Sequence, residues 1–284
     1  MLVTTQDRLL TSCKVWLHRL IDCALPDDPF KNLIEFALRE IQPVTQLSVN
    51  LNKVALLRNS RSLGIPSVTD AAKTCIRAGA HGITVHPRPD QRHIRISDVY
   101  ELAQMMTVEF NIEGNPFIPP FLELVQQVKP TQCTLVPDAP DTFTSDRGWN
   151  LAEVGAHLQP IIHNLRDLGV RVSLFLDPDL TQVQLAKDIE ADRIELYTEP
   201  YAKAFLGENL ETVLQQYAQA AQKAHEIGLG VNAGHDLNRH NLYKFCSIGH
   251  VSEVSIGHAL IADALEFGLF NAVKEYLNVL SMMD

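Results

Sequence analysis

The sequence lacks the features that mark several large classes of protein. Its five cysteines are scattered over 284 residues and form no Cys-x-x-Cys pair, so neither a disulfide framework nor a zinc knuckle is indicated. No apolar run approaches the length of a membrane span. The net charge is -10, which disfavours nucleic acid as the main partner because phosphate neutralisation requires a basic face. We therefore expect a protein of the reducing cytoplasm that binds neither membrane nor nucleic acid.

Signatures of common cofactors are also missing. No GxGxxG fingerprint occurs, and the glycines near residue 230 are misspaced and lead into an expected strand rather than a helix. His86, His93, His235 and His258 could supply metal ligands, but they form no His-x-His or HExxH spacing. The sequence therefore favours neither a dinucleotide nor a metal site.

What the chain does contain is a regular alternation of strand-like and helix-like segments. With 46% hydrophobic residues and no second compositional regime, this alternation predicts an α/β protein with a (β/α)8 TIM barrel over residues 46–284, rather than an open doubly wound sheet. The expected strands cover 47–51, 82–86, 110–113, 133–136, 170–176, 193–197, 229–232 and 251–256. A long polar loop is expected after the first strand, and single long helices are expected after the sixth and eighth. Ser97 is the expected N-cap of a helix over 98–106.

The first 45 residues form a separate segment. Apolar residues recur there at helical spacing over 9–21 and 30–41, and the acidic residues among them do not fit a secretory or organellar presequence. We expect a helical N-terminal extension over 1–45. It could cover a barrel end, form a subunit contact or be loosely attached, and the sequence does not decide among these.

The segment from Gly82 to His93 carries the densest chemistry. A short apolar run predicts a strand buried on both faces, and Pro87 and Pro89 end it at His86 because proline cannot continue a ladder. A titratable imidazole therefore lies where a buried strand meets solvent, beside two arginines and a second histidine. The pattern fits either a polar loop that caps a sheet or an acid–base group beside an anion site.

Recurrence of this pattern favours the second interpretation. Barrel enzymes place their working residues at the C-terminal ends of strands. Five of the eight expected strand ends carry a carboxylate or an imidazole at or just beyond the end, from His86, Glu113, Glu195, His235 and His258. Taken singly, Glu113 and Glu195 could belong to structural ion pairs, and His235 could cap a helix. Gly257 before an expected helix predicts a phosphate site, because backbone N–H groups can approach an anion there.

Several motifs, in order from residue 47 to the C-terminus, carry a family resemblance. They are Asn50-x-Asn52-Lys53, Arg58-Asn59-x-Arg61, Gly82-Ile83-Thr84-Val85-His86-x-Arg88, Arg92-His93, Asn111-Ile112-Glu113, Leu135-Val136-Pro137, Ile194-Glu195, Val231-Asn232-Ala233-Gly234-His235 and Ile256-Gly257-His258. They resemble the pyridoxine 5′-phosphate synthase family, which closes the ring of vitamin B6. The resemblance implies a (β/α)8 barrel with extra helices that assembles as an octamer. It also implies condensation of 1-deoxy-D-xylulose 5-phosphate with 3-amino-2-oxopropyl phosphate, without metal or organic cofactor.

The resemblance also implies a role for each matching position. His86 would be a proton acceptor, Glu113 a second general base and His235 a proton donor, while Glu195 would stabilise a transition state. The positions implied to hold the two phosphorylated substrates are Asn50, Asn52, Lys53, Arg61, Arg88, His93, Thr144, Asp236, Gly257 and His258. Several acid–base groups fit this reaction, because amine addition, loss of water and phosphate, and aromatisation move protons at different atoms.

Two departures from the common family pattern leave alternatives open. Asn52-Lys53 replaces the usual Asp-His, although an Asn-Lys form also occurs, and Asp236 replaces a glycine. These changes bear on how the aminoketone phosphate is hydrogen-bonded. One alternative function is a Schiff-base aldolase with Lys53 as nucleophile. Another is a phosphate-ligand binding protein without catalysis, which would not need the cluster of acid–base residues.

Overall fold

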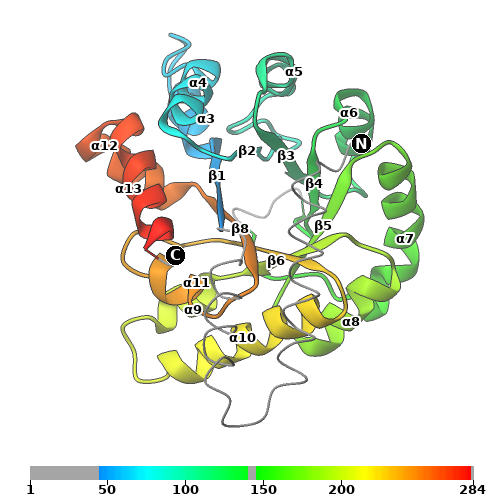
Figure 1. Ribbon diagram of the computed structural model, residues 1–284. Coiled ribbons are helices and arrows are strands. Elements are labelled where there is room, and N and C mark those ends of the chain that lie inside the picture. The colour runs from blue at the N-terminus through cyan, green and yellow to red at the C-terminus, as the bar shows by residue number, and fades with distance from the viewer. Residues whose placement is uncertain (1–44, 140–144, 283–284) are drawn as a thin grey trace, which may run out of the picture. The chain divides into compact units, whose positions relative to one another are not determined.

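Eight parallel strands close into a barrel in the computed structural model, which describes residues 45–139 and 145–282 (Figure 1). Each strand pairs with the next in sequence, and β8 returns to pair with β1. The strands are β1 Gln46–Asn50, β2 Gly82–Val85, β3 Glu109–Gly114, β4 Gln132–Leu135, β5 Arg171–Leu176, β6 Arg193–Tyr197, β7 Gly230–Gly234 and β8 Val251–Ile256. The predicted TIM barrel is confirmed. The helices expected within residues 1–45 lie outside the described residues.

Helices connect the strands and lie around the outside of the barrel (Figure 1). They are α3 Asn52–Asn59, α4 Val68–Ala78, α5 Ile96–Met105, α6 Phe121–Val128, α7 Leu151–Asp167, α8 Leu180–Asp188, α9 Glu199–Ala204, α10 Leu210–Glu226, α11 Leu242–Cys246, α12 His258–Phe267 and α13 Leu269–Ser281. Side-chain caps begin some of them. The Ser67 hydroxyl accepts from the Asp70 N–H at α4, and the Asp179 carboxylate accepts from two N–H groups at α8.

The segment after β1 corrects an expectation, because it forms helix α3 rather than a long loop. Its hydrophobic pattern is weak, but Val54 and Ala55 are buried against the rest of the domain. The Asn50 side chain accepts a hydrogen bond from the Asn52 N–H at the start of the helix. Tertiary burial and this one local contact therefore stabilise a helix that periodicity does not reveal.

Three further boundaries differ from the prediction. Ser97 is not an N-cap, because α5 already begins at Ile96 and the Asp98 carboxylate accepts from the Arg95 N–H. The single helix expected after β6 is two helices, α9 and α10. The last expected helix is broken into α12 and α13 at Gly268, whose φ of 75° lies in the left-handed region.

Several side chains that point into the barrel are polar. Hydrogen bonds cross between strands that are not neighbours in the sheet, from Thr134 on β4 to Glu195 on β6 and from Gln132 on β4 to Glu253 on β8. Only side chains that point into the barrel can make such contacts. The alternate residues of each strand, such as Leu47 and Val49, are fully buried among apolar side chains. The main apolar core therefore lies between strands and helices.

Candidate active site

The C-terminal ends of the strands surround a cavity of about 390 Å³. All but two of the predicted site residues line it: Asn50, Asn52, Lys53, His86, Arg88, His93, Glu113, Glu195, His235, Asp236, Gly257 and His258. The fold thus brings together residues from the ends of six strands and the segments that follow them. This convergence is the geometry that the strand-end pattern predicts.

Two predicted residues are not among those that line the cavity, and seven lining residues were not predicted. Of the described residues, Arg61 is exposed beyond the end of α3 and is not on the cavity wall. Thr144 lies outside the described residues, so its role stays a prediction. The lining residues that the sequence analysis did not predict are Leu56, Arg92, Ser145, Leu237, Ser255, Ile256 and Ala259. Leu56 lies on α3, which the sequence pattern did not predict. Arg92 belongs to the basic cluster after His86, and this was a sequence signal for it.

Two asparagines on β1 and α3 hold the acid–base residues in place. The Asn50 amide donates to Glu113 Oε2 at 3.4 Å, and the Asn52 side-chain oxygen accepts from the backbone N–H of His86 at 2.9 Å. Asn50 also accepts from the Asn52 N–H. An aspartate at position 52 could accept the same bond. In this structure the Asn52 oxygen is therefore engaged in positioning His86.

His86 and Glu113 face each other across 3.9 Å from Nδ1 to Oε2. Burial, together with the Asp138 carboxylate, raises the pKa of Glu113 to about 8 despite the opposing charge of Arg88. Burial also holds the pKa of His86 well below its usual value, and the charge of Arg88 adds to this. Near neutral pH the two side chains meet mainly as a carboxylic acid and a neutral imidazole, not as an ion pair.

Glu195 lies deeper, 2% exposed, on β6. Burial raises its pKa well above the ordinary range, and the nearby Glu113 and Glu253 carboxyls add to the effect. The Thr134 hydroxyl donates to Glu195 Oε2 at 3.3 Å. A Cβ on Gly234 would come within 2.6 Å of Glu195 Oε1, so glycine at the end of β7 leaves room for this carboxyl. Glu195 is therefore a protonated acid that can donate a hydrogen bond.

His235 occupies an aromatic box just past the end of β7. Its ring centroid lies 5.2 Å from that of Phe175 and 5.3 Å from that of Tyr197. Burial lowers the pKa of His235, while the Asp236 and Asp138 carboxylates act against that shift. Both His235 (φ 84°) and Asp236 (φ 58°) have left-handed backbones, an unfavourable conformation that clusters at functional sites.

One part of the cavity wall is basic. Lys53, Arg88, Arg92 and His93 line it, and burial with the neighbouring cations lowers the pKa of His93 to about 4. The backbone that carries His93 is held from α3, because Asn59 donates to the carbonyls of residues 91, 92 and 93. A neutral His93 among fixed cations suits the binding of an anion.

The N-terminus of α12 closes the ring of strand ends. Gly257 precedes its first residue, His258, and the first-turn N–H groups of a helix attract anions. A Cβ on Gly257 would lie 3.1 Å from Cβ of Asn50, so a larger residue would crowd β1. The predicted second anion site thus has an exposed helix N-terminus, and close packing against Asn50 explains why residue 257 is a glycine.

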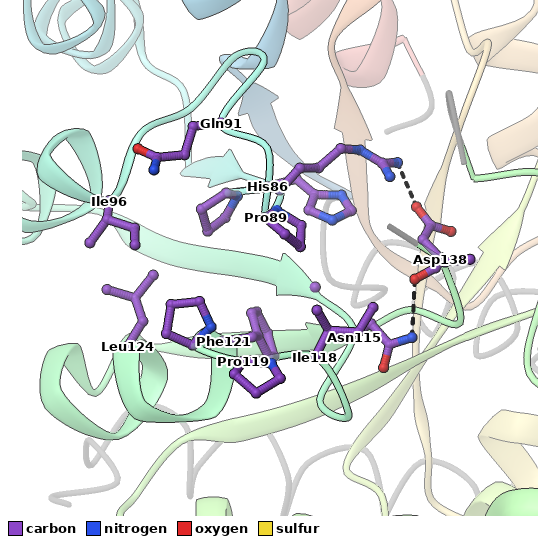
Figure 2. Close-up of a pocket in the computed structure, with 15 residues that line it drawn as sticks. His86, Pro89, Gln91, Ile96, Asn115, Ile118, Pro119, Phe121, Leu124 and Asp138 are labelled. Carbon is purple, nitrogen blue, oxygen red and sulfur yellow. Dashed lines mark hydrogen bonds and ion pairs between the residues drawn. The ribbon is translucent and has the colours of Figure 1, made fainter. Parts of the chain in front are cut away.

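A smaller apolar pocket adjoins the cavity and shares His86 and Arg88 with it (Figure 2). Its volume is only about 30 Å³, and its walls are largely proline, isoleucine, leucine and phenylalanine from the segments that follow β2 and β3. Figure 2 shows Asp138 at one end, with dashed lines for its ion pair and for its contact with Asn115. The basic wall of the cavity is therefore bounded by one buried carboxylate.

The described residues provide neither a metal cluster nor a membrane span. Among them no group of three or more His, Cys, Asp or Glu side chains is placed to hold a metal ion. None of the helices in this part of the chain is both long and apolar enough to cross a bilayer. The chemistry that the cavity offers is acid–base catalysis beside two anion-binding regions.

Comparison with known proteins agrees with this chemistry. The profile of the family described as pyridoxal phosphate biosynthesis protein PdxJ matches residues 47–282. A pyridoxine 5′-phosphate synthase of Porphyromonas gingivalis is 50% identical over 240 residues, covering 84% of this chain and 100% of its own length. One from Xanthomonas campestris pv. campestris is 53% identical over 247 residues, covering 84% of this chain and 96% of its own.

Solved structures show the same fold at much lower identity. One titled "Native KDPGal structure" has a TM-score of 0.55 and 11% sequence identity, and the match covers 85% of this chain and 97% of that one. Identity at this level supports the barrel architecture alone.

Proposed function

The chain belongs to the PdxJ family, and from this premise we propose that it is a pyridoxine 5′-phosphate synthase of vitamin B6 biosynthesis. Its substrates would be 1-deoxy-D-xylulose 5-phosphate and 3-amino-2-oxopropyl phosphate, and its products pyridoxine 5′-phosphate, inorganic phosphate and water. The observation that carries the proposal is the convergence of His86, Glu113, Glu195 and His235 in one cavity with a basic wall.

Two anion-binding regions fit two phosphorylated substrates. Arg88, His93 and Lys53 offer a basic wall, and the N–H groups at the start of α12 offer a second site on the cavity wall beside β1. Holding both substrates in one cavity converts amine addition to a ketone into a step between neighbours. The substrate supplies the attacking amine, so no nucleophilic side chain is needed for that step.

The acid–base residues divide the proton transfers among them. His86 is neutral near pH 7 and can accept a proton, because burial keeps its pKa low. Glu113 must first lose its own proton, and its pKa of about 8 gives a strong base once ionised. His235 can donate to a leaving or developing oxygen, with the carboxylates of Asp236 and Asp138 favouring its protonated form.

Glu195 acts by hydrogen bonding. A buried carboxyl that stays protonated can donate to the negative charge that develops on a carbonyl oxygen, which stabilises the transition state. Thr134 donates to Glu195 Oε2, so it helps to fix the carboxyl's orientation. These roles use only side chains that line the cavity or contact those that do.

The direct test is product formation from both substrates. Purified full-length protein should convert the two substrates into a compound with the mass and fragmentation of pyridoxine 5′-phosphate, accompanied by inorganic phosphate. Omission of either substrate is the control. No product with both substrates present, from protein that is folded and binds phosphate, would refute the synthase and leave a ligand-binding protein.

We also propose an octameric assembly and a cytoplasmic location from the family resemblance. Light scattering coupled to size exclusion should give a mass of about eight chains. A mass of one or two chains at assay concentration would refute the octamer and would not test the proposed activity.

A further inference from the structure

Asp138 joins three of the loops that form the cavity. It lies three residues beyond the end of β4, and its side chain is 4% exposed. Its Oδ2 accepts from Arg88 Nη2 at 2.6 Å and from the Ser145 hydroxyl at 2.6 Å. Its backbone carbonyl accepts from the Asn115 amide at 3.0 Å (Figure 2). Loops after β2, β3 and β4 therefore meet at one residue.

Stability alone is a poor reason for this ion pair. A buried pair loses about as much by desolvation as it gains by attraction, and apolar residues of similar size often replace one without loss. Arg88, however, is also part of the basic cavity wall. A carboxylate that contacts this guanidinium fixes its orientation and neutralises part of its charge.

We propose that Asp138 is a positioning residue of the synthase site, which aims the Arg88 guanidinium and competes with the anionic substrate for it. The inference rests on the proposed function, in which Arg88 binds a phosphorylated substrate. Asp138 thereby weakens the binding of the anionic substrate, because its carboxylate competes for Arg88. In return, the Arg88 guanidinium is already aligned when the substrate binds.

The same carboxylate influences the acid–base residues. Its charge raises the pKa of Glu113 and of His235, and the charge of Arg88 lowers both. The charged or titratable groups around Glu113 are His86 and Arg88 beyond β2, Cys133 on β4, Asp138 beyond β4, Glu195 on β6 and Glu253 on β8. Those around His235 are His86, Arg88, Asp138, Glu199 and Asp236. Loss of the Asp138 charge removes a contribution that raises both pKa values, while Arg88 continues to lower them and Asp236 continues to raise that of His235. Both pKa values should then fall.

The first arm of the test measures anion affinity without using turnover. Inorganic phosphate binding by calorimetry should be roughly 3- to 10-fold tighter in Asp138→Asn, because the amide keeps the shape and removes the competing charge. Asp138→Glu retains the charge and should bind within about twofold of wild type. Asp188→Asn, an exposed carboxylate on α8, is the matched control and should change nothing.

The second arm measures the pH dependence of kcat/KM. Both limbs of the profile should move to lower pH in Asp138→Asn, by roughly one unit, because Glu113 ionises earlier and His235 loses its proton earlier. Arg88→Met removes the opposite charge and should move the acid limb to higher pH. This opposite sign keeps the test decisive even if Asp138→Asn does not fold.

Ser145→Ala separates positioning from simple tethering. It removes one hydrogen bond to Asp138 and leaves the charge, so phosphate affinity and pH limbs should stay near wild type. Weaker phosphate binding in Asp138→Asn with unchanged pH limbs would overturn the proposal. So would a Ser145→Ala variant that tightens phosphate binding and shifts the pH limbs as Asp138→Asn is expected to do. If the wild-type protein makes no pyridoxine 5′-phosphate, the proposed synthase activity is refuted. The phosphate-binding measurements would still test whether Asp138 competes with an anion for Arg88.

Discussion

At the scale of single residues, Glu113 is subject to two opposing influences on one pKa. Desolvation favours the neutral acid, whereas nearby arginine charge favours the carboxylate. Burial and the Asp138 charge prevail, and the pKa rises to about 8. The sequence could name both influences, but their balance depends on depth in the cavity and on a residue 25 positions away in the chain.

Glu113→Gln should therefore lose turnover by roughly 100-fold or more, the usual scale for removal of a general base. The wild type should show a titration in kcat/KM near pH 8 that the variant lacks, because the carboxylate form is the base. Phosphate affinity in the variant should stay near wild type. Steady-state kinetics at pH 6 to 9 measures this. Near-normal turnover in Glu113→Gln would exclude it from the mechanism.

The same substitution should stabilise the protein near neutral pH. Between pH 4.5 and about 8 the folded state keeps a proton on Glu113 that the unfolded chain has released, so wild-type stability falls as pH rises across this window. Removing the ionisable group should add roughly 2 to 3 kcal/mol of unfolding free energy at pH 7. Urea unfolding should show this gain at pH 7 and its disappearance near pH 4. An equal effect at both pH values would contradict the assigned pKa.

Lys53 distinguishes the synthase from a Schiff-base aldolase. It lies in the first turn of α3 on the basic wall, where its charge contributes to lowering the pKa of His93. We expect Lys53→Arg to retain measurable turnover with a raised KM, and Lys53→Met to lose more, because the residue serves as a cationic anchor. A nucleophilic lysine would make both variants equally inactive. Borohydride would then leave a substrate-dependent mass increase on the peptide that contains Lys53.

At the scale of elements, helix α3 holds the loop that carries His93. Arg58 is buried, pairs with Asp98 on α5 through Nη2 at 2.8 Å, and donates to the His93 carbonyl at 3.1 Å. Asn59 adds three bonds to the same loop. An otherwise irregular loop thus has a fixed position beside the cavity.

Arg58→Met should lower the free energy of unfolding by about 3 kcal/mol or more, because it leaves the Asp98 carboxylate buried and unpaired. It should also weaken phosphate binding through loss of the contact with the His93 carbonyl. Lys73→Met breaks an ion pair that is largely exposed and is the matched control, with no measurable change expected. Equal stability of the two variants in urea would contradict this role for Arg58.

At the scale of the whole molecule, two anion sites tie ligand binding to stability. Inorganic phosphate at about ten times the Kd of one site should stabilise the native state by roughly 1.4 kcal/mol through that site. That corresponds to a rise in Tm of roughly 3 to 6 °C for a domain of this size. Calorimetry with sodium chloride at matched ionic strength is the control. No specific rise at high millimolar phosphate would count against both sites.

Much of the architecture was determined by local sequence. The strands over 193–197 and 251–256 were predicted to the residue, because short segments that mix apolar and polar residues between helix-like segments need no distant information. The barrel follows from their alternation with helices, and it places every strand's C-terminal end at one mouth. His86, Glu113 and His235 could therefore be grouped before any contact was known.

Only the tertiary structure decided the rest. Helix α3 depends on burial against other elements, the ion pair of Asp138 with Arg88 spans 50 positions, and the protonation of Glu195 depends on how many carboxyls share the barrel interior. Local sequence specifies which backbone conformations are favourable and which face is apolar. Burial, charge balance and proton affinity are sums over neighbours in space, so they exist only once the chain has folded.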